Sequence, residues 1–150
     1  MRAAVRTVAD AVGRGLLAGA AGTAAMTLSS TLEAKLSGRG SSSTPAEAVS
    51  EATGVELTDE SKPRVNRLAH WGYGVGWGAV RGVLGLLPAS EPLPTIGHFA
   101  VVWGAEQVLL PALGVAKPTW SYGASAAATD VLHHAVYAGT TSAALAWIEA

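Results

Sequence analysis

Five ionisable residues stand inside otherwise apolar segments of this 150-residue chain: Arg81, Glu106, Asp130, His133 and His134. His133 and His134 follow Asp130 by three and four positions, so a helix would place them near the face of that carboxylate. Carboxylates and histidines grouped in this way can exchange protons, hold a small cation or coordinate a metal. The five residues are therefore the candidate site.

The positions of Glu106 and Asp130 predict that the two carboxylates meet. If two antiparallel helices turn near Pro118, residues equidistant from it share a level, and Glu106 and Asp130 are equidistant from it. A turn near Glu91 places Arg81 about 7.5 Å of helical rise from the level of Glu106, which an extended arginine can bridge. We therefore expect a buried polar cluster of Arg81, Glu106, Asp130 and one or both histidines.

Four apolar segments must position this cluster. They cover approximately residues 13–33, 68–88, 94–115 and 121–148, and a polar loop occupies 34–67. The chain is 49% hydrophobic and 14% charged, whereas roughly a quarter of the residues of a soluble domain are charged. Each segment, as a helix, approaches the thickness of a bilayer core. The sequence predicts one all-α domain, an integral membrane bundle of four transmembrane helices with the lipid bilayer as its partner.

Local signals refine this picture. Thr44-Pro45 and Glu47 predict a short helix from about Pro45 to Thr53 in the polar loop, which Gly54 would end. Pro111 is expected to kink the third helix or to end it about four residues earlier. Glycines four residues apart in the second segment offer faces for close helix contact, which favours self-association: Gly72, Gly74, Gly76, Gly78 and Gly82.

Several alternatives stay open. A soluble helical bundle is possible because the first span is weak and the second and third contain charges. Asp130-x-x-His133 resembles one arm of a carboxylate-bridged metal site, with Glu106, Asp130 and His134 as candidate ligands, and His70, His98 and His134 are candidate haem ligands. No cofactor is predicted. The absence of cysteine excludes thiolate sites, and a formal charge of -1 argues against nucleic acid.

A further set of positions is spaced as in a known family. It comprises Glu33 with Arg39, Thr44-Pro45, His70 with Tyr73, Pro111 with Gly114, Pro118 with Trp120, and Asp130 with His134. In these positions the chain resembles the YagU-type bacterial inner-membrane proteins, which carry a domain of unknown function. Glu106 stands where the family has a histidine, and Ser37 and Gly38 replace prolines. The resemblance implies a multi-pass protein of the bacterial plasma membrane, with Glu33, Arg39 and His70 at its outer face.

The sequence thus predicts a small membrane protein that is structural or that handles protons or small ions through the cluster. The carboxylates would accept protons, His134 would shuttle them and Arg81 would supply the counter-charge. The alternative is a membrane-bound metal- or haem-dependent enzyme that uses Glu106, Asp130, His133 and His134.

Overall fold

The computed structural model describes the backbone of residues 2–150 and the side chains of residues 7–150. The elements are α1 (Arg2–Ser37), α2 (Thr44–Thr53), α3 (Lys62–Leu84), α4 (Leu93–Ala112), the 3₁₀ turn η1 (Thr119–Tyr122) and α5 (Ala124–Glu149). Over this described range the chain is helical without any β-strand, which confirms the all-α prediction. The short loop helix begins one residue before the predicted Pro45 and ends at Thr53, where Gly54 takes φ +70°.

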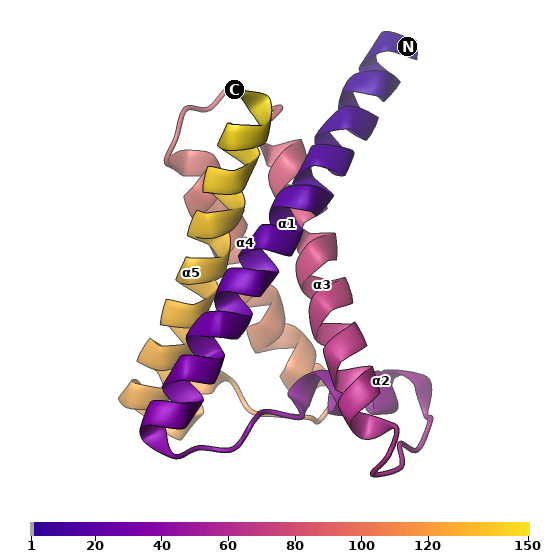
Figure 1. The fold of residues 1–150 in the computed structure, drawn as a ribbon, viewed down its shortest axis with the longest axis vertical. Helices are drawn as coiled ribbons and strands as arrows, with labels where there is room; N and C mark the ends of the chain where they lie inside the picture. Colours follow the sequence, from indigo (N-terminus) through magenta and orange to yellow (C-terminus); the bar gives the residue numbers. More distant parts are fainter. Residues whose placement is uncertain (1) are drawn as a thin grey trace.

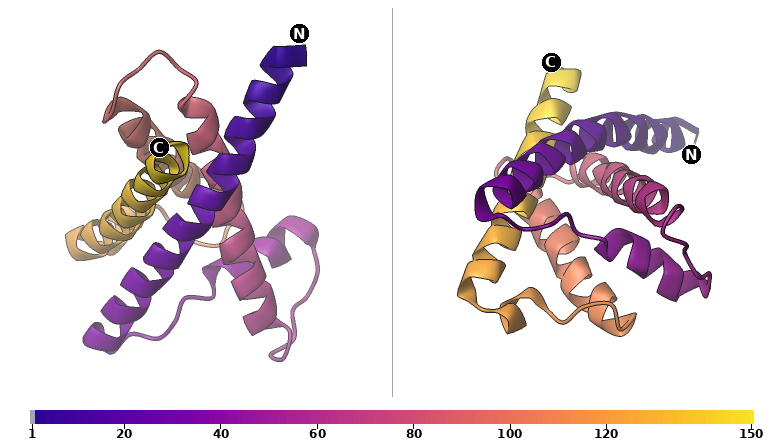
Figure 2. Two further views of the ribbon diagram at one scale, coloured as in Figure 1. Left: turned by 45° about the horizontal axis from the view of Figure 1, so that its top comes forward. Right: turned by 60° about the horizontal axis from the view of Figure 1, so that its bottom comes forward.

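The four long helices form a bundle in which α1 lies across α3 and α5, and α4 lies on the side away from α1 (Figure 1). The two further views agree with this order (Figure 2). Helix α4 packs mainly against α5 and α3, and α2 packs against α3 near the long polar loop.

The prediction of four transmembrane helices is wrong. Within the described residues, no helix has the combination of length and apolar content that crossing a bilayer requires. The long runs are built largely from Ala, Gly, Ser and Thr, which contribute little hydropathy, and α3 carries Lys62, Arg64, Arg67 and Arg81. The assignments as an integral, multi-pass protein and to the bacterial plasma membrane are therefore contradicted as well.

Helices α1 and α3 approach each other through glycines. A Cβ added at Gly78 would overlap the carbonyl oxygen of Gly15 and the Cα of Gly19, and one at Gly82 would overlap the carbonyl oxygen of Ala11. Glycine allows this backbone contact because it has no side chain. One of the predicted glycine faces is thus used within the chain, whereas Gly76 of the same helix has open space around it.

The core lies where α1, α3, α4 and α5 meet. Val102, Tyr137 and Ala138 are buried together, and the Tyr137 hydroxyl donates a hydrogen bond to the carbonyl oxygen of Gly74 at 2.6 Å. His98 is fully buried, and its Nε2 lies 3.0 Å from the carbonyl oxygen of Trp77, which can only accept. Burial lowers the pKa of His98 to about 4, so this histidine is a neutral core residue at pH 7.

The end of α4 sets the path towards the candidate site. The helix continues through Pro111 to Ala112, so it ends later than the proline predicted. Gly114 takes φ +71°, and the N–H groups of Gly114 and Val115 donate to the carbonyls of Pro111 and Leu110, both at 3.0 Å. This Schellman closure directs the chain into η1, whose first residue reaches Asp130.

Candidate metal centre

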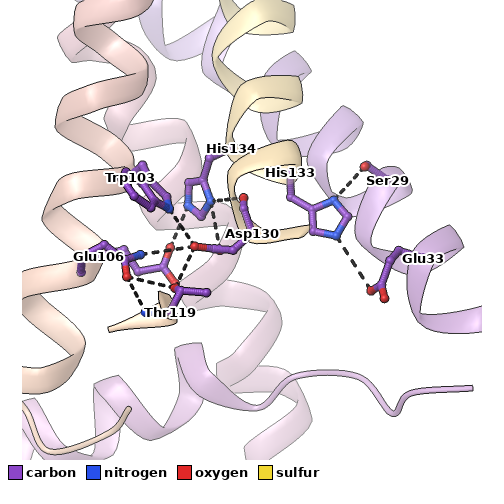
Figure 3. Close-up of polar contacts among 9 residues, drawn as sticks. Ser29, Glu33, Trp103, Glu106, Thr119, Asp130, His133 and His134 are labelled. Atoms are coloured by element: carbon purple, nitrogen blue, oxygen red, sulfur yellow. Dashed lines mark hydrogen bonds and ion pairs between the residues drawn. The ribbon is translucent and has the colours of Figure 1, made fainter. Parts of the chain in front are cut away.

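Glu106, Asp130 and His134 meet at the interface of α4 and α5. The Nε2 atom of His134 lies 2.8 Å from Oε2 of Glu106, and its Nδ1 atom lies 3.3 Å from Oδ1 of Asp130. Figure 3 shows the imidazole of His134 between the two carboxylates. Each residue offers one ligand atom, and these three atoms lie within 4.8 Å of one another. The structure therefore brings three of the five predicted site residues together.

A ring of donors fixes the carboxylate of Asp130. Its Oδ2 atom accepts from the indole N–H of Trp103 at 2.8 Å and from the amide of Gln107 at 3.3 Å, and the Thr119 hydroxyl lies 2.9 Å away (Figure 3). Gln107 is in turn held by the backbone N–H of Thr119, which donates to its Oε1 at 2.7 Å. These three hydrogen bonds occupy Oδ2, so the other oxygen, Oδ1, faces His134. In metal sites, hydrogen bonds from surrounding residues orient the ligands in the same way.

The orientation of His134 is set by its own helix. Nδ1 lies 3.0 Å from the backbone carbonyl oxygen of Asp130, an acceptor only, so Nδ1 carries a hydrogen. The other nitrogen, Nε2, faces Glu106. A histidine whose Nδ1–H is bound to a carbonyl and whose Nε2 faces a carboxylate is oriented as metal-binding histidines are.

The two carboxylates stabilise a proton on His134. Burial alone would lower the pKa of this imidazole, but hydrogen bonds and charge from Asp130 and Glu106 outweigh burial and raise it to about 10. Burial also opposes ionisation of Asp130, yet hydrogen bonds from His134, Trp103 and Thr119 bring its pKa below the usual value. At pH 7 the site consequently holds an imidazolium whose charge a bound cation could replace.

The site is open enough for an ion to enter. The side chain of His134 is 6% exposed, that of Asp130 19% and that of Glu106 27%. Tetrahedral zinc with bonds of about 2.0–2.1 Å separates its ligand atoms by about 3.3 Å. Nε2 of His134 and Oε2 of Glu106 are 2.8 Å apart, and the three ligand atoms lie within 4.8 Å of one another, so a cation could replace the proton between Nε2 and Glu106 once the side chains adjust to that spacing.

Arg81 does not join this cluster. Its guanidinium forms an ion pair with Glu91 in the α3–α4 connection, and its Nε donates to the hydroxyl of Ser142 at 2.8 Å. Arg81 is in the last turn of α3, close to the connection that contains Glu91. The guanidinium therefore pairs with Glu91 and does not extend along the bundle to Glu106. The expected contact between Arg81 and Glu106 was wrong.

His133 also lies elsewhere, and its side chain leaves α5 in a different direction from that of His134 (Figure 3). Its Nδ1 atom is 2.8 Å from the hydroxyl of Ser29 on α1, and its Nε2 atom is 3.9 Å from Oε2 of Glu33. Burial lowers the pKa of His133. Consecutive helical residues point about 100° apart, so two adjacent histidines on α5 contact two different helices.

The positions that resemble the YagU-type family are dispersed. Glu33 and Arg39 form an ion pair at the end of α1, and this contact lowers the pKa of Glu33. His70 lies 2.9 Å from the Thr27 hydroxyl, and burial lowers its pKa. Pro111, Gly114 and Pro118 shape the connection between α4 and η1. Histidines 70, 98 and 134, the candidate haem ligands, each have a different hydrogen-bond partner.

Sequence reasoning missed the partners of Asp130. Trp103 stacks on Phe99, and its indole N–H also fixes the carboxylate of Asp130. Trp103, Glu106 and Gln107 are spaced by three and four positions, so they share one face of α4, and that spacing was a usable signal. No sequence signal indicated Thr119, because its contact with Asp130 depends on the path of the chain between α4 and α5.

Comparison of the chain with protein-family models, curated protein sequences and solved structures gives no match. The resemblance to the YagU-type family therefore stays a prediction.

Proposed function

We propose that this chain binds a divalent first-row transition-metal ion through Glu106, Asp130 and His134. The observation that carries the proposal is the convergence of one imidazole nitrogen and two carboxylate oxygens within 4.8 Å. The donors around Asp130 and the carbonyl bound to His134 Nδ1 hold two of these ligands in place before the ion arrives. Such outer contacts commonly change metal affinity 10- to 100-fold.

The donor set selects among cations. One imidazole and two carboxylates suit Zn²⁺, Mn²⁺, Fe²⁺ and Co²⁺, whereas Mg²⁺ and Ca²⁺ prefer oxygen ligands alone. The chain has no cysteine, so sites that depend on thiolate ligands are excluded. Three protein ligands leave at least one position of a tetrahedral ion for water or another small ligand.

The ion and the proton compete for Nε2 of His134. A metal requires the neutral imidazole, so binding releases the proton that Glu106 and Asp130 stabilise. The charge of the ion then replaces the charge of the imidazolium between the same two carboxylates. Affinity should accordingly increase with pH.

A second candidate function is a purely structural one, in which the imidazolium ties α4 to α5. It is favoured by the fact that His134 already contacts Glu106 and Asp130 without an ion. In that case the three residues set helix register, and no metal binds with useful affinity. The two functions differ in a measurable way.

The test is calorimetric titration of Zn²⁺ and Mn²⁺ into the chelator-stripped chain, alongside four variants. We expect one site per chain for the wild type, loss of that site in His134→Asn, and at least tenfold weaker binding in Asp130→Asn and Glu106→Gln. His133→Asn is the matched control, since the same residue type is removed one position away, and it should bind like the wild type. If the wild type binds no metal, or if His133→Asn loses binding to the same extent as His134→Asn, the metal-binding proposal is contradicted and the structural role is the one supported.

A further inference from the structure

His133 has a buried ring nitrogen that makes no hydrogen bond. The imidazole lies between α5 and α1, its side chain is 9% exposed, and its Nδ1 atom is 2.8 Å from the Ser29 hydroxyl. The other nitrogen, Nε2, is sealed from solvent and has no hydrogen-bond partner among the described residues. A buried polar atom of this kind costs free energy and is uncommon in folded proteins, so we looked for an occupant that would satisfy it.

The contact with Ser29 determines which nitrogen of His133 carries the hydrogen. The hydroxyls of Thr27 and Ser30 donate to backbone carbonyls of α1, whereas the Ser29 hydroxyl has no acceptor other than His133 among residues 7–150. Its hydrogen therefore points to Nδ1, and Nε2 carries the N–H. This tautomer also directs a donor, and not a lone pair, towards the carboxylate of Glu33. If the ring takes up a second proton, Nε2 still carries its hydrogen.

The gap between His133 and Glu33 fits one bridging oxygen atom. Nε2 and Oε2 are 3.9 Å apart, which is too far for a direct hydrogen bond. An oxygen about 2.8 Å from both atoms would accept from Nε2–H and donate to the carboxylate, with an angle of about 90° between the two contacts. Figure 3 shows the imidazole between Ser29 and Glu33. Because Nε2 is sealed, the side chain of Glu33, which is 26% exposed, has to turn slightly to admit this oxygen.

A shallow hollow in the protein surface adjoins the gap. It measures about 560 Å³, within the range of small-molecule sites, and Ser29, Glu33 and His133 line part of it. Most of its remaining wall consists of leucine side chains, each more than half exposed: Leu32, Leu36 and Leu132. A hydrocarbon group in the hollow would remove this leucine surface from water. The hollow thus combines one polar point with apolar walls.

We propose that this hollow binds an uncharged alcohol or phenol with a hydrocarbon body, whose hydroxyl bridges His133 Nε2 and Glu33. The two polar groups select this head group. An anionic head group would face the carboxylate of Glu33, and a cationic one would face the N–H of His133. A hydroxyl accepts from the N–H and donates to the carboxylate through a single atom.

The site is one for binding and not for ester hydrolysis, although a serine, a histidine and a carboxylate are in line. Ser29 lies within α1, whose backbone N–H groups are bonded inside the helix. Around Ser29, the described residues therefore offer no pair of free N–H groups to stabilise an oxyanion, on which acyl transfer depends.

The first test is titration of the wild-type chain with para-ethylphenol, followed by backbone amide NMR spectra in the presence of a chelator. We expect saturable shifts centred on residues 29–37 and 132–133. Binding of para-ethylanisole should be at least about tenfold weaker, because a methyl group replaces the hydrogen that the phenol donates. Lack of saturation by the phenol, equal affinities for the two compounds, or shifts centred on another part of the chain would overturn the proposal.

The second test uses variants of the two polar groups. Glu33→Gln keeps the shape of the side chain and removes the charge of the acceptor, so we expect about tenfold weaker binding of the phenol. Glu47→Gln removes the acid of another ion pair, with Lys62, and is the matched control that should bind like the wild type. His133→Phe should lose the preference for the phenol over the anisole. Wild-type affinity in Glu33→Gln, or an unchanged preference in His133→Phe, would contradict the proposed bridge. Since a chelator is present throughout, these results do not depend on the metal centre.

Discussion

His134 and Glu106 join α4 to α5, with the Nε2 and Oε2 atoms 2.8 Å apart. The same imidazole contacts Asp130 through its other nitrogen, so one ring links two carboxylates from two helices. The species that occupies Nε2, a proton or a metal ion, determines the charge between these carboxylates. Occupancy of this atom should therefore affect both stability and binding.

The metal-free chain should lose stability as pH increases above 6.5. The Glu106 and Asp130 contacts raise the pKa of His134 from 6.5 to about 10. Below 6.5 the imidazole is protonated in both the folded and the unfolded chain, and the full stabilisation is present. Between 6.5 and about 10 only the folded chain keeps the proton, so the free energy of unfolding falls, by about 5 kcal/mol over this window.

Urea denaturation at a series of pH values with a chelator present measures this effect. The difference between wild type and His134→Gln isolates the contribution of one ring from that of other groups titrating near pH 10. We expect the variant to show a flatter dependence from pH 6.5 to 9. Parallel curves for the two proteins would show that His134 does not hold a stabilised proton.

Replacing Trp103 by Phe should weaken metal binding without preventing it. The change removes the indole N–H that donates to Oδ2 of Asp130 at 2.8 Å and keeps an aromatic ring against Phe99. Loss of an outer-shell donor typically lowers affinity 10- to 100-fold. Trp147→Phe, at a position 82% exposed, is the control for removing an indole elsewhere. Unchanged zinc affinity in Trp103→Phe would mean that Asp130 is not a ligand.

Alanine at Gly78 should destabilise the bundle, whereas alanine at Gly76 should not. The new Cβ at position 78 overlaps backbone atoms of Gly15 and Gly19, which no side-chain rotation relieves. Overpacking of this kind costs about 1–3 kcal/mol. At position 76 the Cβ meets open space, and the better helix propensity of alanine stabilises by up to about 1 kcal/mol. Thermal unfolding of the two variants compares them, and equal midpoints would contradict the close α1–α3 contact.

The acid side of the stability profile should depend on His98. Burial lowers its pKa from 6.5 to about 4, so the unfolded chain takes up a proton at this residue before the folded chain does. Stability is complete above 6.5 and decreases as pH falls towards 4, by roughly 3 kcal/mol. Burial lowers the pKa values of His70 and His133 too, so they act in the same direction.

His98→Gln keeps a donor for the Trp77 carbonyl and removes the titrating group. Its free energy of unfolding should change less between pH 6.5 and 4 than that of the wild type, as measured by urea denaturation. If the wild-type profile is flat over this range, His98 is not buried as the structure shows.

The part of the fold that could be predicted from the sequence follows from helical periodicity. The predicted turn near Pro118 correctly placed Glu106 and Asp130 at the same level of two antiparallel helices, because residues equidistant from such a turn lie side by side when both helices have the same rise per residue. The loop helix was predictable from Thr44-Pro45 and Gly54, whose backbone preferences are local.

The remainder depended on information that is not local. Whether Arg81 meets Glu106 or Glu91 is decided by the course of the α3–α4 connection, and periodicity does not specify it. Which of His133 and His134 faces α4 depends on the rotation of α5 about its axis. The membrane assignment failed for another reason: a low content of charged residues resembled lipid exposure, although the small residues of α1 and the basic residues of α3 keep the hydropathy of these helices low.

The most direct test of the central claim is anomalous diffraction from crystals of the chain grown with one equivalent of Zn²⁺. The proposal predicts one strong peak at about 2.0–2.2 Å from Nε2 of His134 and from carboxylate oxygens of Glu106 and Asp130. A zinc peak at His133, or no peak between α4 and α5, would contradict the assignment of this cluster as a metal centre.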